Sequence, residues 1–210
     1  MAVQTRARGA SQKALRRENI LDAAEQLFQT SSYADISMHA VSDVLGLSKG
    51  TLYLYFESKE SLFLGLTERA LNSYFSYLIT HLPARPSTPE SLAKTMVNGF
   101  KSEKLLPQYL SNLHTVFEHN VEYETVLAFK KFLLGKVERT GLAIDTVMEW
   151  PVGSGSQALI RGHALVIGLQ HMAAPSLPVA KALLEPELKV FRIDFVDSLS
   201  QSLPLLLKPV

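Results

Sequence analysis

The sequence predicts an all-α protein in which an N-terminal three-helix domain with a helix-turn-helix precedes a larger helical domain. Three observations lead to this fold class. Apolar residues recur at helical spacing along most of the 210 residues, and serine, glycine and proline divide the chain into lengths typical of helices. No long stretch alternates apolar with polar residues as a strand would. A hydrophobic content of 47% is ample for a packed core.

The chain begins with a basic segment. Five cations precede the first acidic residue, Glu18, namely Arg6, Arg8, Lys13, Arg16 and Arg17. We expect residues 1–13 to form a basic flexible arm, which either follows a nucleic-acid groove or remains a solvated tail. The first helix then carries apolar residues at i, i+4, i+7 and i+8, which are Ile20, Ala24, Leu27 and Phe28.

A short helix and a turn follow. Ser37 can cap this helix, whose apolar positions Val41, Val44 and Leu45 lie at i, i+3 and i+4. Gly46 supplies the permissive backbone that ends it. We expect the three apolar side chains to face inward.

Ser48 can cap a second short helix, which we expect to turn Leu52 and Phe56 inward. Its exposed positions carry groups that can donate to phosphate oxygens or base edges: Lys49, Thr51, Tyr53 and Tyr55. Ser58 then caps a third helix with Lys59 in its first turn, where a cation opposes the helix dipole. A nearby phosphate explains that lysine better than helix stability does.

The run from Gly46 to Glu60, GLSKGTLYLYFESKE, resembles the DNA-binding domain of the TetR family of bacterial repressors. The resemblance covers about residues 14–66 and involves some dozen positions across two turns, which makes it specific. It implies a helix-turn-helix DNA-binding domain over 14–60 and a ligand-binding and dimerisation domain over 61–210. It further implies a homodimer that binds a palindromic DNA operator and is released by a small-molecule effector.

The resemblance also assigns DNA-contacting positions. These are Ser37, His39, Ser48, Lys49, Gly50, Thr51, Tyr53, Tyr55 and Lys59. Thr51 and Tyr53 would meet bases and phosphates, and Lys59 would grip a phosphate. Leu54 departs from the polar or aromatic residue often found in the family, although a thymine methyl would suit it. The alternative for Tyr53 and Tyr55 is that both pack in the core.

The pattern of the rest of the chain predicts successive helices. Leu62, Leu66, Ala70, Tyr74 and Leu78 predict one long helix, and the following proline cluster marks a domain boundary. Further helices are expected over about 89–101, 107–120, 126–147, 157–172 and 187–207, with an irregular connection around Pro175, Pro178 and Pro186.

The last two of these helices are candidates for a dimer interface. The helix over 157–172 is apolar nearly all round and must be covered on more than one side, which a symmetry mate can do. Its small residues Gly162, Ala164 and Gly168 permit close helix approach. The alternative is that both helices bury each other within a monomer.

Polar residues on apolar faces suggest an effector site. His114 and Glu118 stand at i and i+4, and His163 lies on an otherwise apolar helix. Three interpretations remain open: the residues line a pocket, they share a metal ion, or they satisfy one another. For the pocket we name His114, Phe117, Glu118, Phe129, Leu133 and His163 as ligand-binding residues.

Composition and motifs exclude several classes of protein. The chain has no cysteine, no 18-residue apolar run and no apolar signal segment, so we expect a cytoplasmic protein without disulfides or membrane spans. No enzyme motif or cofactor fingerprint is present, and we expect no cofactor and no metal. The expected function is a ligand-responsive repressor whose effector is partly apolar. An activator of the same fold, or a small-molecule carrier without DNA function, is the alternative.

Overall fold

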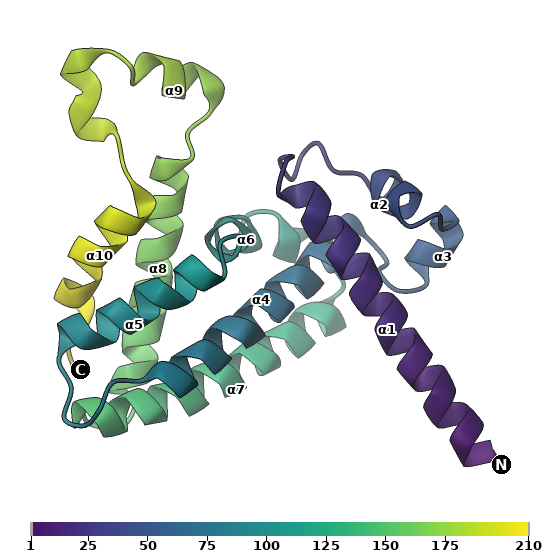
Figure 1. Cartoon of the computed structure of the whole chain (residues 1–210), viewed down its shortest axis with the longest axis horizontal. Coiled ribbons are helices and arrows are strands. Elements are labelled where there is room, and N and C mark those ends of the chain that lie inside the picture. Colours follow the sequence, from purple (N-terminus) through teal and green to yellow (C-terminus); the bar gives the residue numbers. More distant parts are fainter. Residues whose placement is uncertain (1, 210) are drawn as a thin grey trace.

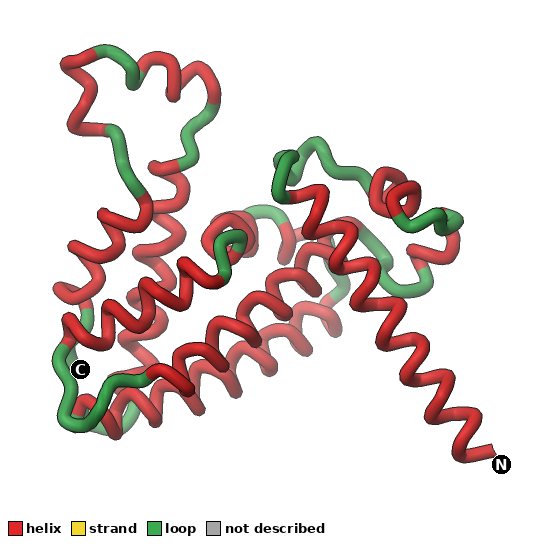
Figure 2. The backbone as a smooth tube through the Cα atoms, in the orientation of Figure 1, coloured by secondary structure: helices red, strands yellow, loops and turns green. Residues whose placement is uncertain are grey.

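The computed structural model describes residues 2–209, with side chains from residue 11 onward. Over this range the chain folds into helices joined by loops, without a strand (Figure 2). In chain order the elements are α1 Ala2–Phe28, α2 Met38–Val44, α3 Lys49–Tyr53, α4 Lys59–His81, α5 Pro89–Ser102, α6 Leu106–Leu113, the 3-10 helix η1 Phe117–His119, α7 Tyr123–Met148, α8 Ser154–Ala173, α9 Leu177–Ala182, the 3-10 helix η2 Pro186–Phe191 and α10 Phe195–Leu206.

The N-terminal helices form a head made of α1, α2, α3 and the start of α4 (Figure 1). As predicted, the side chains of Ser37, Ser48 and Ser58 cap α2, α3 and α4 by accepting from backbone N–H groups. Gly46 has φ 61°, the left-handed conformation that lets the chain turn between α2 and α3.

Two expectations for the head differ from the structure. The predicted arm, residues 1–13, is from Ala2 onward the beginning of α1, while Met1 and the side chains of the arm before residue 11 lie outside the described residues. Val44 does not face inward with Val41, because its side chain is 51% exposed whereas Val41 is fully buried. The buried residues of α2 are Met38, Val41 and Ser42, so its inward face is centred on these positions and Val44 lies beside it.

The long helix α4 joins the head to the rest of the molecule. Its buried residues run from Leu62 to Leu78, so both halves of the chain pack against it. On the head side, the guanidinium of Arg69 lies 2.6 Å from Asp22 and 3.0 Å from Glu25 of α1. This partly buried network fixes the angle between α1 and α4.

The C-terminal domain surrounds the second half of α4. In Figure 1, α7 runs alongside α4, and α6, α7 and α10 pack against α8, while α5 packs against α4 and α10. The helices α7 and α8 approach closely at Gly141 and Gly155, where an added Cβ on Gly155 would lie 2.3 Å from the carbonyl oxygen of Gly141. The buried carboxylate of Asp145 accepts from the backbone N–H groups of Gly153 and Gly155, so α7 caps α8.

Two predicted helices are shorter than expected. The helix expected over 107–120 ends at Leu113, and residues 117–119 form η1. The helix expected over 187–207 is interrupted, because Asp194 caps a new helix, α10, by accepting from the backbone of Asp197. The connection expected to be irregular contains α9.

The segment from α9 to η2 projects beyond α8 and α10 (Figure 1). It has no buried residue, but it is ordered by Arg192, whose guanidinium donates to backbone carbonyls of Leu183, Leu184 and Glu185. We refer to residues 177–191 as the projecting segment.

Candidate DNA-binding surface and effector cavity

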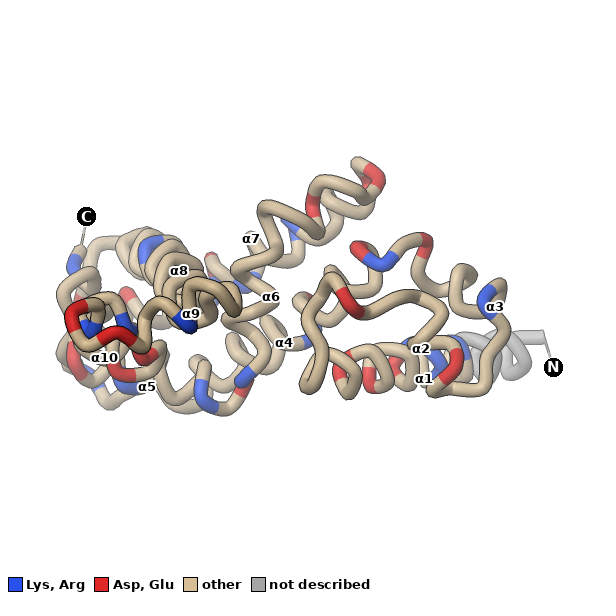
Figure 3. The backbone as a smooth tube through the Cα atoms, turned by 90° about the horizontal axis from the view of Figure 1, so that it is seen from above, with Lys and Arg blue, Asp and Glu red and all other residues tan. Residues whose placement is uncertain are grey.

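The start of α2 and the helix α3 present hydrogen-bond donors to solvent. The exposed residues among those predicted to contact DNA are Ser37, His39, Ser48, Lys49, Gly50 and Tyr53. Figure 3 shows the basic position of α3 at the outer end of the head, whereas acidic positions lie along α1. The positive charge that α3 offers to a polyanion is therefore local.

The start of α3 is organised by its cap. The hydroxyls of Ser48 and Thr51 lie 2.8 Å apart, and the Ser48 oxygen also accepts from the Thr51 backbone N–H. Tyr53 and Leu54 project from the end of the helix, with 41% and 77% of each residue exposed. Tyr55 is only half-buried and packs against the core, so its ring serves both surface and interior.

Lys59 is held by an aromatic ring. Its ammonium lies 3.9 Å from the centroid of Tyr33, and the Tyr33 hydroxyl donates to the carboxylate of Glu60 at 2.8 Å. Burial lowers the pKa of Lys59, while the charges of Glu60 and Asp35 act in the opposite direction. Burial and the bond to Glu60 raise the pKa of Tyr33. A cation–π contact therefore accounts for part of what the sequence attributes to phosphate.

His39 has a carboxylate neighbour. Its Nδ1 lies 3.3 Å from Asp43 one turn later, and both side chains are well exposed. The exposed imidazole can donate to a phosphate, but Asp43 competes with that phosphate for the same group.

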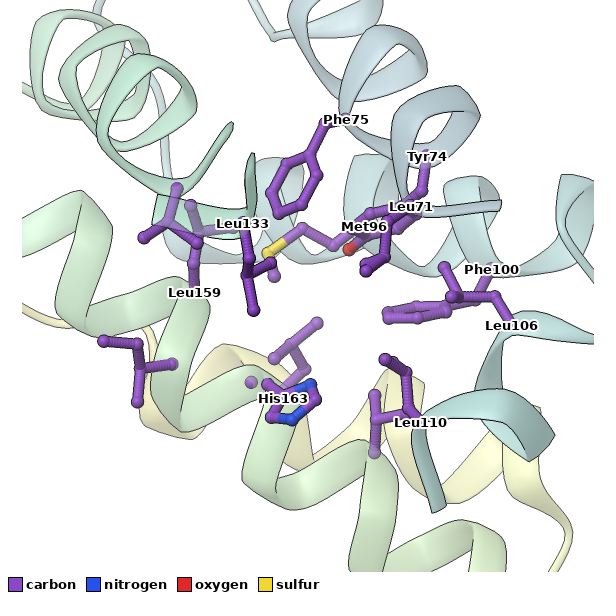
Figure 4. A pocket seen from close by; sticks show the side chains of 15 residues that line it. Leu71, Tyr74, Phe75, Met96, Phe100, Leu106, Leu110, Leu133, Leu159 and His163 are labelled. Atoms are coloured by element: carbon purple, nitrogen blue, oxygen red, sulfur yellow. The ribbon is translucent and has the colours of Figure 1, made fainter. Parts of the chain in front are cut away.

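A cavity of about 100 Å³ lies in the C-terminal domain between α4, α5, α6, α7, α8 and α10 (Figure 4). Two of its lining residues, Tyr74 and His163, carry polar side-chain atoms. The others are Leu71, Phe75, Met96, Phe100, Leu106, Leu110, Leu133, Val137, Leu159, Ile160, Gly162, Val166 and Leu203. Such a lining suits an apolar guest oriented by a few polar groups.

His163 belongs to a chain of polar contacts that leads away from the cavity. Its Nε2 lies 3.2 Å from Nε2 of His114, and Nδ1 of His114 lies 3.2 Å from Glu118. The other carboxylate oxygen of Glu118 is 2.7 Å from the ammonium of Lys130 on α7. Burial lowers the pKa of His163 to about 4, with smaller contributions from His114 and Lys130.

The predicted effector residues occupy different places. Leu133 and His163 line the cavity, and His114 and Glu118 lie behind His163. Phe117 and Phe129 are buried but do not line it. Phe117 packs against Phe63 and Tyr33, so η1 touches the head. Phe129 instead lines a groove that runs between α1, α4 and α7.

One polar residue of the cavity wall, Tyr74, was not predicted from the sequence. The regular spacing of α4 assigns it to the core, and it is indeed buried. Its hydroxyl nevertheless has no hydrogen-bond partner among the described residues, and burial raises its pKa. A tyrosine at an apolar position, where phenylalanine would pack equally well, is the signal that could have identified it.

Two possible properties of the chain can be checked directly on the described residues. They contain no group of three or more His, Asp or Glu side chains arranged to hold a metal ion. Within residues 2–209, no helix is both long and apolar enough to cross a membrane.

The head and the cavity define a helix-turn-helix protein with a separate helical domain that can enclose a small molecule. Family models match both parts: residues 20–66 match the bacterial regulatory proteins of the tetR family, and residues 68–208 match the tetracyclin repressor-like C-terminal domain. The chain therefore belongs to the TetR family of transcriptional regulators. The boundary between the two matches falls within α4.

Individual relatives share parts of the sequence. An uncharacterised HTH-type transcriptional regulator of Lactococcus lactis is 28% identical over 87 residues, or 41% of this chain and 44% of that protein. EthR of Mycobacterium tuberculosis, an HTH-type transcriptional regulator, is 36% identical over 83 residues, or 39% of this chain and 38% of EthR. The chain thus matches less than half the length of these curated relatives.

Solved structures share the fold of the whole chain. PfmR, a TetR-family regulator from Thermus thermophilus, superposes with a TM-score of 0.54 over 91% of this chain and 98% of PfmR. The sequence identity is 17%, so the likeness concerns the arrangement of helices.

Proposed function

We propose that this regulator is a repressor that binds a palindromic operator as a homodimer and is released when a small molecule fills the cavity. The observation that carries the proposal is the continuity of α4. Its first turn supplies Lys59 to the head, and Leu71, Tyr74 and Phe75 of the same helix line the cavity. A ligand that changes the packing around these three side chains changes the position of the head.

The exposed face of α8 supports the homodimer. Ile160, Ala164, Gly168 and Met172 follow one another at four-residue steps along α8, and each is exposed in the single chain. They form a narrow stripe of apolar and small residues along the exposed side of the helix. A two-fold axis would pack two such stripes against each other and hold two heads roughly 34 Å apart on DNA.

A second contact runs from the cavity to the head. Glu118 of η1 is bonded to His114, which in turn contacts His163 in the cavity wall. The adjacent Phe117 packs on Tyr33, whose ring holds Lys59. A displacement of His163 by a ligand would therefore reach Lys59 through η1 as well as along α4.

Two measurements test the proposal. Fluorescence anisotropy should show salt-dependent, sequence-specific binding to DNA upstream of the protein's own gene, and sedimentation should show a dimer. Compounds that raise the melting temperature of the free protein should weaken this DNA binding, because linkage makes the coupling reciprocal.

A variant with Thr51→Ala and Tyr53→Ala serves as a control, since it should lose specific DNA binding and keep the compound-induced rise in melting temperature. Stabilising compounds that leave operator affinity unchanged would contradict release by a ligand. A monomer that binds the operator at full affinity would contradict the homodimer.

A further inference from the structure

The hydroxyl of Tyr74 is a polar group without a partner inside an apolar cavity. The ring is fixed on three sides. Its centroid lies 4.4 Å from that of Phe100 and 5.7 Å from that of Phe75, and one edge of the ring packs against Gly99. A Cβ on Gly99 would lie 2.8 Å from the tyrosine ring, so α5 makes room for this side chain. A buried hydroxyl that lacks a hydrogen bond lowers the stability of the empty protein.

The second polar group is His163, which lies across the cavity from Tyr74 (Figure 4). Glu118, ion-paired with Lys130, can only accept a hydrogen bond from Nδ1–H of His114. The Nε2 atoms of His114 and His163 lie 3.2 Å apart, so one of the two imidazoles donates to the other. Among the described residues only Nε2 of His163 has a hydrogen-bond partner, so Nδ1 of the ring is left for a ligand.

We propose that the effector is a small, uncharged and largely apolar molecule with one hydroxyl group, which bonds to the Tyr74 hydroxyl and to the imidazole of His163. A hydroxyl suits both groups, because it can donate one hydrogen bond and accept another, and the phenol and the imidazole nitrogen can each take the complementary role. This inference rests on the proposed function, since it names the chemistry of the effector that the function requires.

The charge and size of the cavity restrict the ligand further. Its lining contains no Lys, Arg, Asp or Glu, and the ion pair of Glu118 with Lys130 is separated from His163 by His114. An ionised ligand would lose its hydration without gaining a counter-charge, which is costly. A volume of about 100 Å³ exceeds the space of a single water molecule and approaches that of cavities that accept one benzene ring.

A matched set of one-ring compounds tests this inference at neutral pH. The probes are benzyl alcohol, toluene, benzoate and benzylammonium, which share a ring and differ in one group. Calorimetric titration of the full chain without DNA should give a dissociation constant for benzyl alcohol about fivefold below that for toluene, as one net hydrogen bond implies. Benzoate and benzylammonium should bind about tenfold more weakly than benzyl alcohol, or not measurably.

Tyr74→Phe removes one oxygen atom and should abolish most of the preference for benzyl alcohol over toluene. Tyr77→Phe is the matched control on the same helix, because Tyr77 stacks on His81 and does not line the cavity. This variant should keep the wild-type preference. His163→Leu should reduce the preference as well, while toluene continues to bind.

Three results would overturn the inference: benzoate or benzylammonium binding as tightly as benzyl alcohol, an unchanged preference in Tyr74→Phe, or no binding of either neutral probe at its solubility limit. A different result would contradict the proposed function. Binding of benzyl alcohol without any loss of operator affinity would contradict ligand release while leaving the ligand class intact.

Discussion

Two lysines of the head differ in what already surrounds them. Lys59 rests on the ring of Tyr33, so its removal changes packing in the head as well as charge. Lys49 is exposed at the start of α3 and forms no ion pair with another described residue. Lys49 is therefore the cleaner probe of phosphate contact.

Replacing Lys49 with Ala should weaken specific and non-specific DNA binding alike. The slope of log affinity against log salt should become shallower by about one unit, because one fewer counterion is released. Binding titrations over a range of salt concentrations measure this slope. Lys131→Ala, an exposed lysine on α7, is the control and should leave the slope unchanged. An unchanged slope in Lys49→Ala would remove this residue from the interface.

Substitutions at Thr51 and Tyr53 should act on sequence recognition. Thr51→Ala or Tyr53→Ala should weaken operator binding by about 1 to 3 kcal/mol and affect random DNA much less, because base contacts rather than charge are lost. Anisotropy with operator and random duplexes separates the two effects. An equal loss on both duplexes would assign the residues to the phosphate backbone.

His163 should make stability depend on pH. Its pKa is lowered from 6.5 to about 4, so the unfolded chain binds the proton more tightly than the folded protein does. Stability from this group is complete above pH 6.5 and declines as the pH falls toward 4. Allowing for the partial exposure of His163, we expect the free energy of unfolding to fall by about 2 kcal/mol over this pH range. Urea unfolding of wild type and His163→Leu at several pH values checks this, and an equally steep decline in both would refute it.

For single residues, the sequence predicted contacts between positions close together in the chain but not contacts between distant positions. His114 and Glu118 are bonded as their spacing suggested, even though η1 replaces the expected helical turn. The contact between His114 and His163 joins residues 49 positions apart, which helical periodicity cannot indicate. The unpartnered hydroxyl of Tyr74 depends on how α4 and α5 pack, so spacing alone placed it only in the core.

Among the helices, the pair α7 and α8 shows how small residues act. Small residues were predicted to permit close approach at Gly162, Ala164 and Gly168. Within the single chain, the tightest backbone approach at a glycine is that of Gly141 and Gly155. Gly162 contacts Met96 and Leu203, whereas Gly168 faces open space. The small residues thus predicted close approach for α8, but not that it occurs at Gly155, at the start of the helix.

Gly155→Ala should destabilise the protein by about 2 to 3 kcal/mol, because the new methyl group meets the Gly141 carbonyl and forces the two helices apart. Chemical denaturation measures the change. Gly135→Ala on α7 is the matched control, since an added Cβ there meets nothing within 4 Å. That control should instead gain about 0.5 to 1 kcal/mol from reduced backbone freedom. Similar results for both variants would mean that α8 can move away at little cost.

Element boundaries were predictable where capping residues stand at the start of a helix. The serines before α2, α3 and α4 all cap as expected. The C-terminal boundaries were less accurate. Asp194 and Asp197 contain the signal for the start of α10, but the apolar residues on either side of them suggest one continuous helix.

On the scale of the whole molecule, the exposed stripe of α8 determines the expected assembly. Ala164→Glu should place two carboxylates at the two-fold axis beside apolar surface, which dissociates the dimer. Operator affinity should fall as the dimer dissociates. Sedimentation at several protein concentrations measures the dissociation. Ala128→Glu, an exposed position on α7, controls for added charge and should remain a dimer. An intact Ala164→Glu dimer would place the interface elsewhere, with the projecting segment as the next surface to examine.

One side chain belongs to two surfaces at once. Ile160 lines the cavity, yet 52% of it is exposed on the outer stripe of α8. If a partner covers this isoleucine, the effector and the partner contact opposite sides of the same residue. By linkage, a ligand that binds the dimer and the monomer with different affinities then changes the dimerisation constant. The dose of effector needed for induction would then vary with the number of regulator molecules in the cell, so the abundance of the protein would itself tune its sensitivity.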